Sequence, residues 1–521
     1  MAIKQLEKGN HMTTATNLIE RGFWAKELPP PFVSATLANN LAAVASNVPS
    51  KLSPTRAETY SIPRVKTNRR YMGGQDPFRQ ALMALEIEQH WPTLVTHFGQ
   101  SNLSMSKPTI RGSRALLPEK SYGEMKRLRP ELSVGCRFLL KTDITRFYPS
   151  IYTHSVPWAL HTKATAKAKR RSMTLLGNRL DQLLRDSQDG QTMGVAIGPD
   201  TSLVIAEIIG CSIDGLLQAS GIQDHACRYV DDFFVYCRTQ SDAESAYAAI
   251  ARVLHEFELE PNHTKTEILQ LPEILEDRWA SELRLYPVRD NSGQPGDLVT
   301  FFSKAYEHSL ENPSEGVLKY AMQKAKTFAI ELSNWPLFES LILRSVIDEP
   351  SVLPHATDIL VSHQVAGYPL RVSLVAEALN EVINHHAPLG HTFEVAWSLW
   401  MHKALGISLS RAVTKPIEGM DSGVVALLAL DLQNSGLTQA TLNSSYWQSL
   451  MVPPSLHDGH WLLSYEADQK SWLPGHPTQG NAWNALISLG VEFYDVTKTH
   501  PTFPVSGKDS QHDSPIEDEE Y

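Results

Sequence analysis

Acidic side chains occur at two places where carboxylates could act together on a bound cation. Asp143 ends the apolar segment CRFLLKTD, and Asp231 and Asp232 lie side by side between the apolar segments HACRYV and FFVYCR. Adjacent carboxylates between buried strands repel each other unless a cation compensates their charge. Their oxygens favour Mg²⁺ or Mn²⁺ over zinc, and two such ions can activate a 3′-hydroxyl and hold a triphosphate for in-line attack. A single aspartate at a strand end is more often a turn former, which explains Asp143 alone but not the adjacent pair.

A glycine-rich segment lies between the two acidic places. Gly194 and Gly198-Pro199 belong to the segment GVAIGP, and the apolar segment that follows is predicted to be a buried helix. Glycines let the backbone approach a bound nucleotide closely, and a helix N-terminus favours phosphate. Taken alone, the segment would be an ordinary glycine turn.

These residues need a sheet and packed helices to position them. The composition predicts a strand over 136–144, a buried helix over 199–220, a β-hairpin over 225–238 and an amphipathic helix over 241–259. This order favours an α+β fold, with a sheet that carries its helices on one face.

The length of 521 residues indicates two to four structural units. We expect an N-terminal helical extension over 1–50, a catalytic region over 51–290, an all-α domain over 291–504 and an acidic, disordered tail over 505–521. Helical segments beyond residue 300 recur about every 35–45 residues, which is consistent with stacked helix pairs and equally with an irregular helical domain.

The formal net charge of -10 does not by itself suggest a nucleic-acid partner, but the charge is unevenly distributed. Basic residues exceed acidic ones by about eight over 51–130, whereas acidic residues exceed basic ones by about 13 over 301–521. Since a local basic surface is what contacts phosphates, we expect nucleic acid near the first region. Self-association or protein contact is the expectation for the helical half.

The remaining composition favours a cytoplasmic protein without a membrane partner. The N-terminus lacks the apolar core of a signal peptide, and no run of about 18 apolar residues is present. The four cysteines have no metal-binding spacing, so reduced, buried thiols are expected.

The acidic motifs resemble those of reverse transcriptases. The segment YVDD at 229–232 matches the Y-x-D-D box, and Asp143 with Phe147-Tyr148 matches the first catalytic box. The resemblance implies a fingers–palm domain over 51–290 that acts on dNTPs with two Mg²⁺ or Mn²⁺ ions. It also implies that Asp143 and Asp231 are the principal metal ligands, supplemented by the carbonyl of Ile144, and that Asp232 assists at the metal site.

The same resemblance gives roles to further residues. Tyr148 occupies the position of an aromatic gate that would collide with a 2′-hydroxyl, with an ordinary core residue as the alternative. The segment GVAIGP resembles the G-x-P-x-G-P box, with Ala196 in place of the usual proline. In EPNHTKT at 260–266, Lys265 would approach the pyrophosphate leaving group, with a surface lysine as the alternative. Candidates for gripping the triphosphate and the template, unless they form a solvated basic face, are Arg69, Arg70, Arg111 and Arg114.

A second resemblance concerns the segment YTHSVPWALH at 152–161, with Lys163 and Lys167 after it. It is similar to the AbiK-like group of bacterial abortive-infection reverse transcriptases, and LPPPF at 28–32 and the helical half fit the same group. The group implies an antiphage role, a homo-oligomer, and DNA that is either made without a template and attached to a tyrosine or copied from a dedicated non-coding RNA. The alternatives are a retron- or intron-like enzyme that copies structured RNA, and a non-catalytic nucleic-acid-binding scaffold.

Protein priming would require a hydroxyl that reaches the active site. Tyr521 ends the acidic tail, whose 16 or so residues would span on the order of 50 Å when extended. It is therefore the candidate primer, with Tyr60 and Tyr71 as rivals and a merely solubilising tail as the ordinary alternative.

Overall fold

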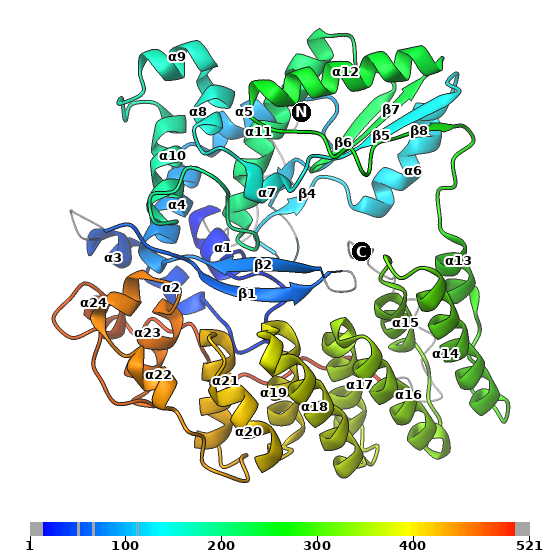
Figure 1. Ribbon diagram of the computed structural model, residues 1–521, viewed down its shortest axis with the longest axis vertical. Helices are drawn as coiled ribbons and strands as arrows, with labels where there is room; N and C mark the ends of the chain where they lie inside the picture. The colour runs from blue at the N-terminus through cyan, green and yellow to red at the C-terminus, as the bar shows by residue number, and fades with distance from the viewer. Residues whose placement is uncertain (1–13, 49–52, 65–67, 111, 113, 506–521) are drawn as a thin grey trace, which may run out of the picture.

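The computed structural model describes residues 14–48, 53–64, 68–110, 112 and 114–505 (Figure 1). Its N-terminal part is three short helices, a β-hairpin and two longer helices: α1 (Thr14–Glu20), α2 (Ala35–Asn39), α3 (Leu41–Ser46), β1 (Glu58–Pro63), β2 (Arg69–Gly74), α4 (Pro77–Gln89) and α5 (Trp91–Phe98). Asp76 caps α4 by accepting a hydrogen bond from the Arg79 backbone N–H, with Pro77 in the first turn.

A four-stranded antiparallel sheet forms the centre of the catalytic region. Its strands lie in the order β6 (Ala226–Tyr229), β7 (Asp232–Cys237), β5 (Phe138–Thr142) and β8 (Glu267–Gln270). We call it the central sheet. The predicted strand and hairpin are therefore present, and the predicted α+β fold is confirmed.

Helices cover both faces of the central sheet, so the expectation of one covered face is wrong (Figure 1). Helices α11 (Asp200–Ala219) and α12 (Gln240–Glu256) pack on one face, and α6 (Tyr122–Ser133) packs on the other. Alternate residues of β5 and β7 point to opposite faces, and the residues on the α6 side form a separate small core with Met125. The continuous apolar character of these strands is typical of a sheet buried on both faces.

Between the first acidic residue and the glycine-rich segment, the chain forms four helices. They are α7 (Phe147–Ser150), α8 (Ser155–His161), α9 (Lys163–Ala168) and α10 (Leu176–Asp186). Two-residue strands β3 (Pro108–Thr109) and β4 (Leu117–Pro118) pair separately.

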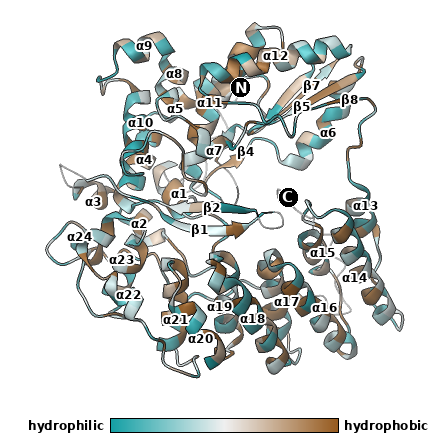
Figure 2. Cartoon of the chain, viewed as in Figure 1, coloured by the Kyte–Doolittle hydropathy of each residue, from teal (hydrophilic) through white to brown (hydrophobic). Residues whose placement is uncertain are grey.

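The C-terminal half is helical, as predicted, and its helices follow one another along an arc (Figure 1). They are α13 (Arg278–Leu285), α14 (Gln294–Glu311), α15 (Val317–Ala325), α16 (Trp335–Asp348), α17 (Leu353–Val365), α18 (Val372–His386), α19 (Thr392–Leu405), α20 (Arg411–Glu418), α21 (Gly423–Asn434), α22 (Ser445–Ser449), α23 (Trp461–Gln469) and α24 (Trp483–Ser488). Figure 2 shows hydrophobic and hydrophilic residues on the helices of this arc, as expected where one side packs and the other faces water.

The N-terminal part packs directly against the last helices of this arc. The rings of Trp24 and Trp461 are stacked with their centroids 5.9 Å apart, and the Trp461 indole donates a hydrogen bond to the carbonyl of Gly74 at 3.0 Å. A side chain at position 74 would collide with the Trp24 ring, so only glycine fits there. One continuous hydrophobic core thus includes residues from Ala15 to Tyr494.

Helix α11 is long and apolar enough to cross a membrane by length and composition alone. However, 67% of its apolar window is buried inside the fold, where it packs against α5 and α12. The four cysteines are free, and three of them are buried whereas Cys136 is half-buried.

Candidate active site

The three candidate carboxylates lie at one end of the central sheet. In the register between β5 and β7, Thr142 pairs with Phe233, so Asp143 and Asp232 stand next to this last pair on neighbouring strands. Asp232 also pairs with Tyr229 of β6, which leaves Val230 and Asp231 as the tight turn of the hairpin. Residues about ninety positions apart in the sequence are therefore brought together.

The backbone of this turn is strained at Val230, whose φ is 54°. A β-branched residue rarely adopts positive φ, and such strain persists only where neighbouring contacts hold it. Those contacts are present, because the Val230 N–H donates to Ser106 Oγ at 2.9 Å and the Val230 carbonyl accepts from Arg228 at 2.7 Å. The turn is thus fixed on both sides of Val230.

The three carboxylates interact electrostatically. The pKa of Asp231 is raised from 3.8 to about 7, mainly by burial and in part by the negative charges of Asp232 and Asp143, while Lys265 opposes the shift. The negative charges of Asp232 and Asp143 thus act on Asp231 at the end of the sheet, and Lys265 compensates them only in part.

A divalent cation fits this arrangement of carboxylates. Asp143 is 5% exposed, and its Oδ1 atom is buried without a hydrogen-bond partner among the described residues. An unpaired buried carboxylate oxygen beside two further carboxylates is what a hard cation such as Mg²⁺ would satisfy.

Lys265 lies at the same place. Its Nζ atom is 2.7 Å from Asp143 Oδ2, and its side chain is 54% exposed. Two backbone hydrogen bonds attach the segment before Lys265 to residues 143–145. Asn262 N donates to the Asp143 carbonyl at 2.8 Å, and Thr145 N donates to the Glu260 carbonyl at 2.9 Å. This pairing brings the lysine to the carboxylates and leaves Ile144 buried beside them.

Tyr148 and the glycine-rich segment are joined through their backbones. Val195 N donates to the Tyr148 carbonyl at 2.9 Å, and Gly73 N of β2 donates to the Ile197 carbonyl at 2.8 Å. Gly198 has a φ of 125°, and a Cβ there would lie 2.9 Å from that of Ala25, so glycine is required. Pro199 then precedes α11. The loop therefore connects the candidate gate with the β1–β2 hairpin, and Ala196 lies within it.

The structure pairs two of the candidate gripping arginines with carboxylates of the protein. Arg114 donates to Asp200 and to the carbonyls of Trp24 and Gly198. Arg69 donates to both oxygens of Glu394 on α19. Arg70 is exposed on β2, and Arg111 lies outside the described residues.

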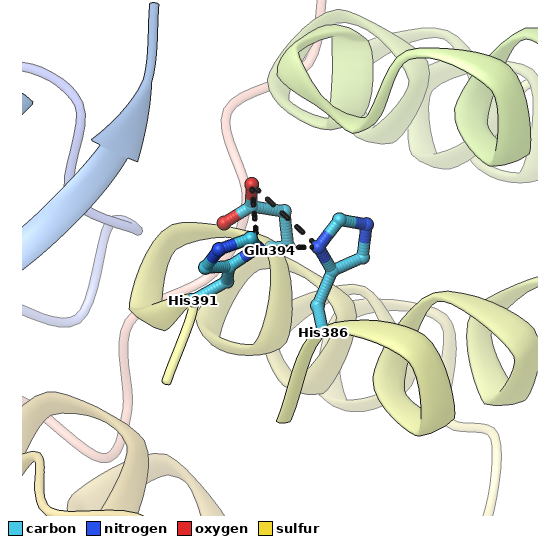
Figure 3. A group of neighbouring side chains, drawn as sticks. All are labelled: His386, His391 and Glu394. Atoms are coloured by element: carbon cyan, nitrogen blue, oxygen red, sulfur yellow. Dashed lines mark hydrogen bonds and ion pairs between the residues drawn. The ribbon is translucent and has the colours of Figure 1, made fainter. Parts of the chain in front are cut away.

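Glu394 belongs to a small cluster with His386 and His391 (Figure 3). The Nδ1 atoms of the two histidines are 2.8 Å apart, and burial lowers the pKa of His386 to about 4. Arg69 compensates the charge of Glu394, the only carboxylate in this cluster, and this ion pair joins the hairpin to the helical half.

Two of the candidate priming tyrosines differ in accessibility. Tyr60 is buried at 2% exposure, whereas Tyr71 is 65% exposed. Tyr521 lies outside the described residues, as does the acidic tail from residue 506.

One buried residue near the turn was missed from the sequence. Arg228, 1% exposed, lies three residues before Asp231 and forms ion pairs with Glu207 and Asp214 of α11. An arginine within the apolar segment HACRYV was the available signal, because a buried charge requires partners.

Comparison with known proteins finds a family match over the part of the chain that holds the candidate site. The family model described as reverse transcriptase (RNA-dependent DNA polymerase) matches residues 82–289. No curated protein matches the chain. Among solved structures, apo telomerase from Candida tropicalis aligns with 74% of this chain and 76% of its own, at 11% identity and a TM-score of 0.33. Asp143, the glycine-rich segment, the YVDD turn and Lys265 all fall inside the family match.

Proposed function

We propose that this chain, an RNA-directed DNA polymerase by virtue of its reverse transcriptase domain, makes DNA by two-metal nucleotidyl transfer in a bacterial antiphage defence system. The observation that carries the catalytic proposal is the convergence of Asp143, Asp231 and Asp232 beside Lys265. Carboxylates held together against their mutual repulsion are expected where a cation binds.

Asp143 and Asp231 would hold the ions, with the Ile144 carbonyl and Asp232 in support. Two bound Mg²⁺ or Mn²⁺ ions would supply an activated 3′-hydroxyl and charge compensation on the triphosphate. Lys265, half-exposed beside Asp143, would neutralise the charge that develops on the pyrophosphate. Tyr148 would exclude a 2′-hydroxyl and so select dNTPs, while Gly198 and Pro199 would shape the backbone that faces the nucleotide.

The defence role rests on the resemblance of the segment at 152–161 and of the helical half to the AbiK-like group. It includes assembly into a homo-oligomer and DNA synthesis that is either untemplated and primed by a tyrosine or copied from a dedicated non-coding RNA. Of the candidate primers, the 2% exposure of Tyr60 disfavours it, which leaves Tyr71 and Tyr521.

The catalytic proposal is tested by dNTP incorporation with Mg²⁺ or Mn²⁺. We expect the wild type to incorporate dNTPs and the double variant Asp231→Asn with Asp232→Asn to lose at least about 10³-fold, since the ligands act as a unit. Asparagine has nearly the same shape as aspartate, so we expect the double variant to fold like the wild type and to lack only the two carboxylates. Equal incorporation by both proteins would rule out the proposed site.

The mode of synthesis is tested by sequencing nucleic acid that co-purifies with the protein, with and without protease treatment. A protein-primed enzyme should yield DNA that stays attached after denaturation and maps to one tyrosine. Attachment that persists in Tyr521→Phe but disappears in Tyr71→Phe would assign the primer to the hairpin instead of the tail. A product complementary to one cellular RNA would indicate templated synthesis.

A further inference from the structure

A buried polar network lies directly beneath the strained turn. The Arg228 guanidinium donates to Asp214 at 2.9 and 2.8 Å and to Glu207 at 2.8 and 3.2 Å. All three side chains are no more than 1% exposed. Its remaining donor on Nη1 reaches the Val230 carbonyl at 2.7 Å. The guanidinium therefore joins two acidic residues of α11 to the backbone of the residue before Asp231.

The Val230 N–H is bound by Ser106, one of three serines that also hydrogen-bond to the acids of this network. Ser106 Oγ accepts from Val230 N at 2.9 Å and donates to Glu207 at 3.3 Å, while Ser104 also donates to Glu207. Ser101 donates to Asp214 at 2.6 Å. Both backbone polar groups of Val230 are thus bonded to one connected set of buried side chains.

Stability of the fold alone does not explain a buried network of charged side chains. Two carboxylates and a guanidinium removed from water are often no more stabilising than apolar residues of similar volume. Burial acts to raise the pKa of Glu207, and the Arg228 charge nevertheless holds it below its ordinary value, so the acid stays ionised. A strained backbone such as that of Val230 persists only where surrounding contacts hold it in place. The network provides these contacts through its hydrogen bonds to the Val230 N–H and carbonyl.

The helix beside the network is shaped to admit the guanidinium. A Cβ at Gly210 of α11 would lie 2.7 Å from the Arg228 Cζ and Nη1 atoms. Glycine within a helix is unfavourable relative to alanine, so space for Arg228 is the physical reason for glycine there. Gly215, five residues further along α11, has nothing within 4 Å of the same Cβ.

We infer that Arg228, oriented by Glu207 and Asp214 and accommodated by Gly210, is a positioning residue that fixes the Val230 backbone and thereby aims the Asp231 carboxylate at the metal ion. The inference rests on the proposed function, in that the metal at Asp231 is the one used for nucleotidyl transfer. The arginine contacts no reacting group itself and acts only through the turn.

The matched pair Gly210→Ala and Gly215→Ala tests this inference in the full-length protein. Both changes improve helix propensity equally, but only the first displaces the guanidinium. We expect Gly210→Ala to bind Mn²⁺ about tenfold more weakly, the lower range for lost support around a metal ligand, as measured by calorimetric titration. The Mg²⁺ concentration for half-maximal dNTP incorporation should rise in parallel. Gly215→Ala should match the wild type in both measurements.

Ser106→Ala provides a second route to the same turn and decides the matter if Gly210→Ala does not fold. It removes the acceptor for Val230 N without adding volume, and we expect weaker Mn²⁺ binding with a retained cooperative thermal transition. Wild-type Mn²⁺ affinity in a folded Gly210→Ala protein, or in Ser106→Ala, would overturn the inference.

The variant Asp231→Asn with Asp232→Asn measures how much Mn²⁺ binds at other places on the chain. Its Mn²⁺ affinity therefore lets failure of this inference be distinguished from failure of the proposed function. If the wild type binds Mn²⁺ through these residues but incorporates no dNTP, the proposed function fails, while the Mn²⁺ comparison still decides the role of Arg228.

Discussion

At the scale of single residues, the fold gives Asp231 a protonation behaviour that its sequence context does not reveal. Burial, together with the charges of Asp232 and Asp143, raises its pKa from 3.8 to about 7. The folded chain therefore favours the neutral carboxyl. In the absence of metal, this contribution to stability is present at low pH and is lost as the pH rises through about 7.

The first prediction compares Asp231→Asn with the wild type in chelator. At pH 8 the Asn variant should be more stable by on the order of 1 kcal/mol or more, because it carries no buried charge and each pKa unit corresponds to about 1.4 kcal/mol. The difference should shrink as the pH falls below about 7. Denaturant unfolding at several pH values measures it, and a difference that stays constant from pH 5 to pH 8 would contradict the raised pKa.

Added Mg²⁺ should raise the wild-type melting temperature more at pH 8 than at pH 6, since the cation competes with the proton for the carboxylate. Asp231→Asn should show a smaller response at both pH values.

At the scale of elements, the β1–β2 hairpin packs against α19, where an ion pair reinforces a hydrogen bond from the Thr392 N–H to Ser61 Oγ at 3.4 Å. Arg69 donates to both oxygens of Glu394, whose side chain is 1% exposed, and Arg69 itself is 12% exposed. The hairpin also contacts the glycine-rich loop through Gly73. The pair thus ties the helical half to the loop beside the active site.

The second prediction uses neighbouring arginines on β2. Arg69→Met should destabilise the protein by about 3–5 kcal/mol, because it leaves the buried Glu394 carboxylate uncompensated. Arg70→Met, at an exposed position, should change stability by no more than about 0.5 kcal/mol. Chemical denaturation checks both values. If Arg69→Met left stability unchanged but raised the KM for dNTP, the arginine would be a substrate-binding residue instead.

At the scale of the whole molecule, the N-terminal helices and the last helices of the arc share one core. Trp461 is fully buried, stacks on Trp24 and donates to the Gly74 carbonyl. N-terminal and C-terminal elements thereby pack together at the β1–β2 hairpin, so we expect the stability of this part to depend on both.

The third prediction concerns Trp461. Trp461→Ala should cost about 3–5 kcal/mol, since it removes a large buried ring, whereas Trp461→Phe should cost less because the aromatic contact remains. Melting of both variants should show one cooperative transition. Two transitions, of which only the later one involved the central sheet, would show that the helical half unfolds separately.

Local sequence patterns were enough to predict the candidate catalytic residues and the backbone elements that carry them. Asp143, Asp231, Asp232 and Lys265 stand in short motifs whose local backbone is a strand end, a hairpin turn or a paired loop, and the structure brings all four together. The hairpin, the buried helix and the helical half were predictable for the same reason, because periodicity and turn residues are local properties.

The pairing of charges and the covering of the sheet faces became apparent from the folded structure alone. The partner of Arg69 lies 325 residues away, α6 covers the second face of the central sheet, and Arg228 finds its acids one helix earlier. A guanidinium bonds in the same way to a substrate phosphate and to a protein carboxylate. Which of the two it meets depends on long-range packing, and no local sequence pattern carries that information.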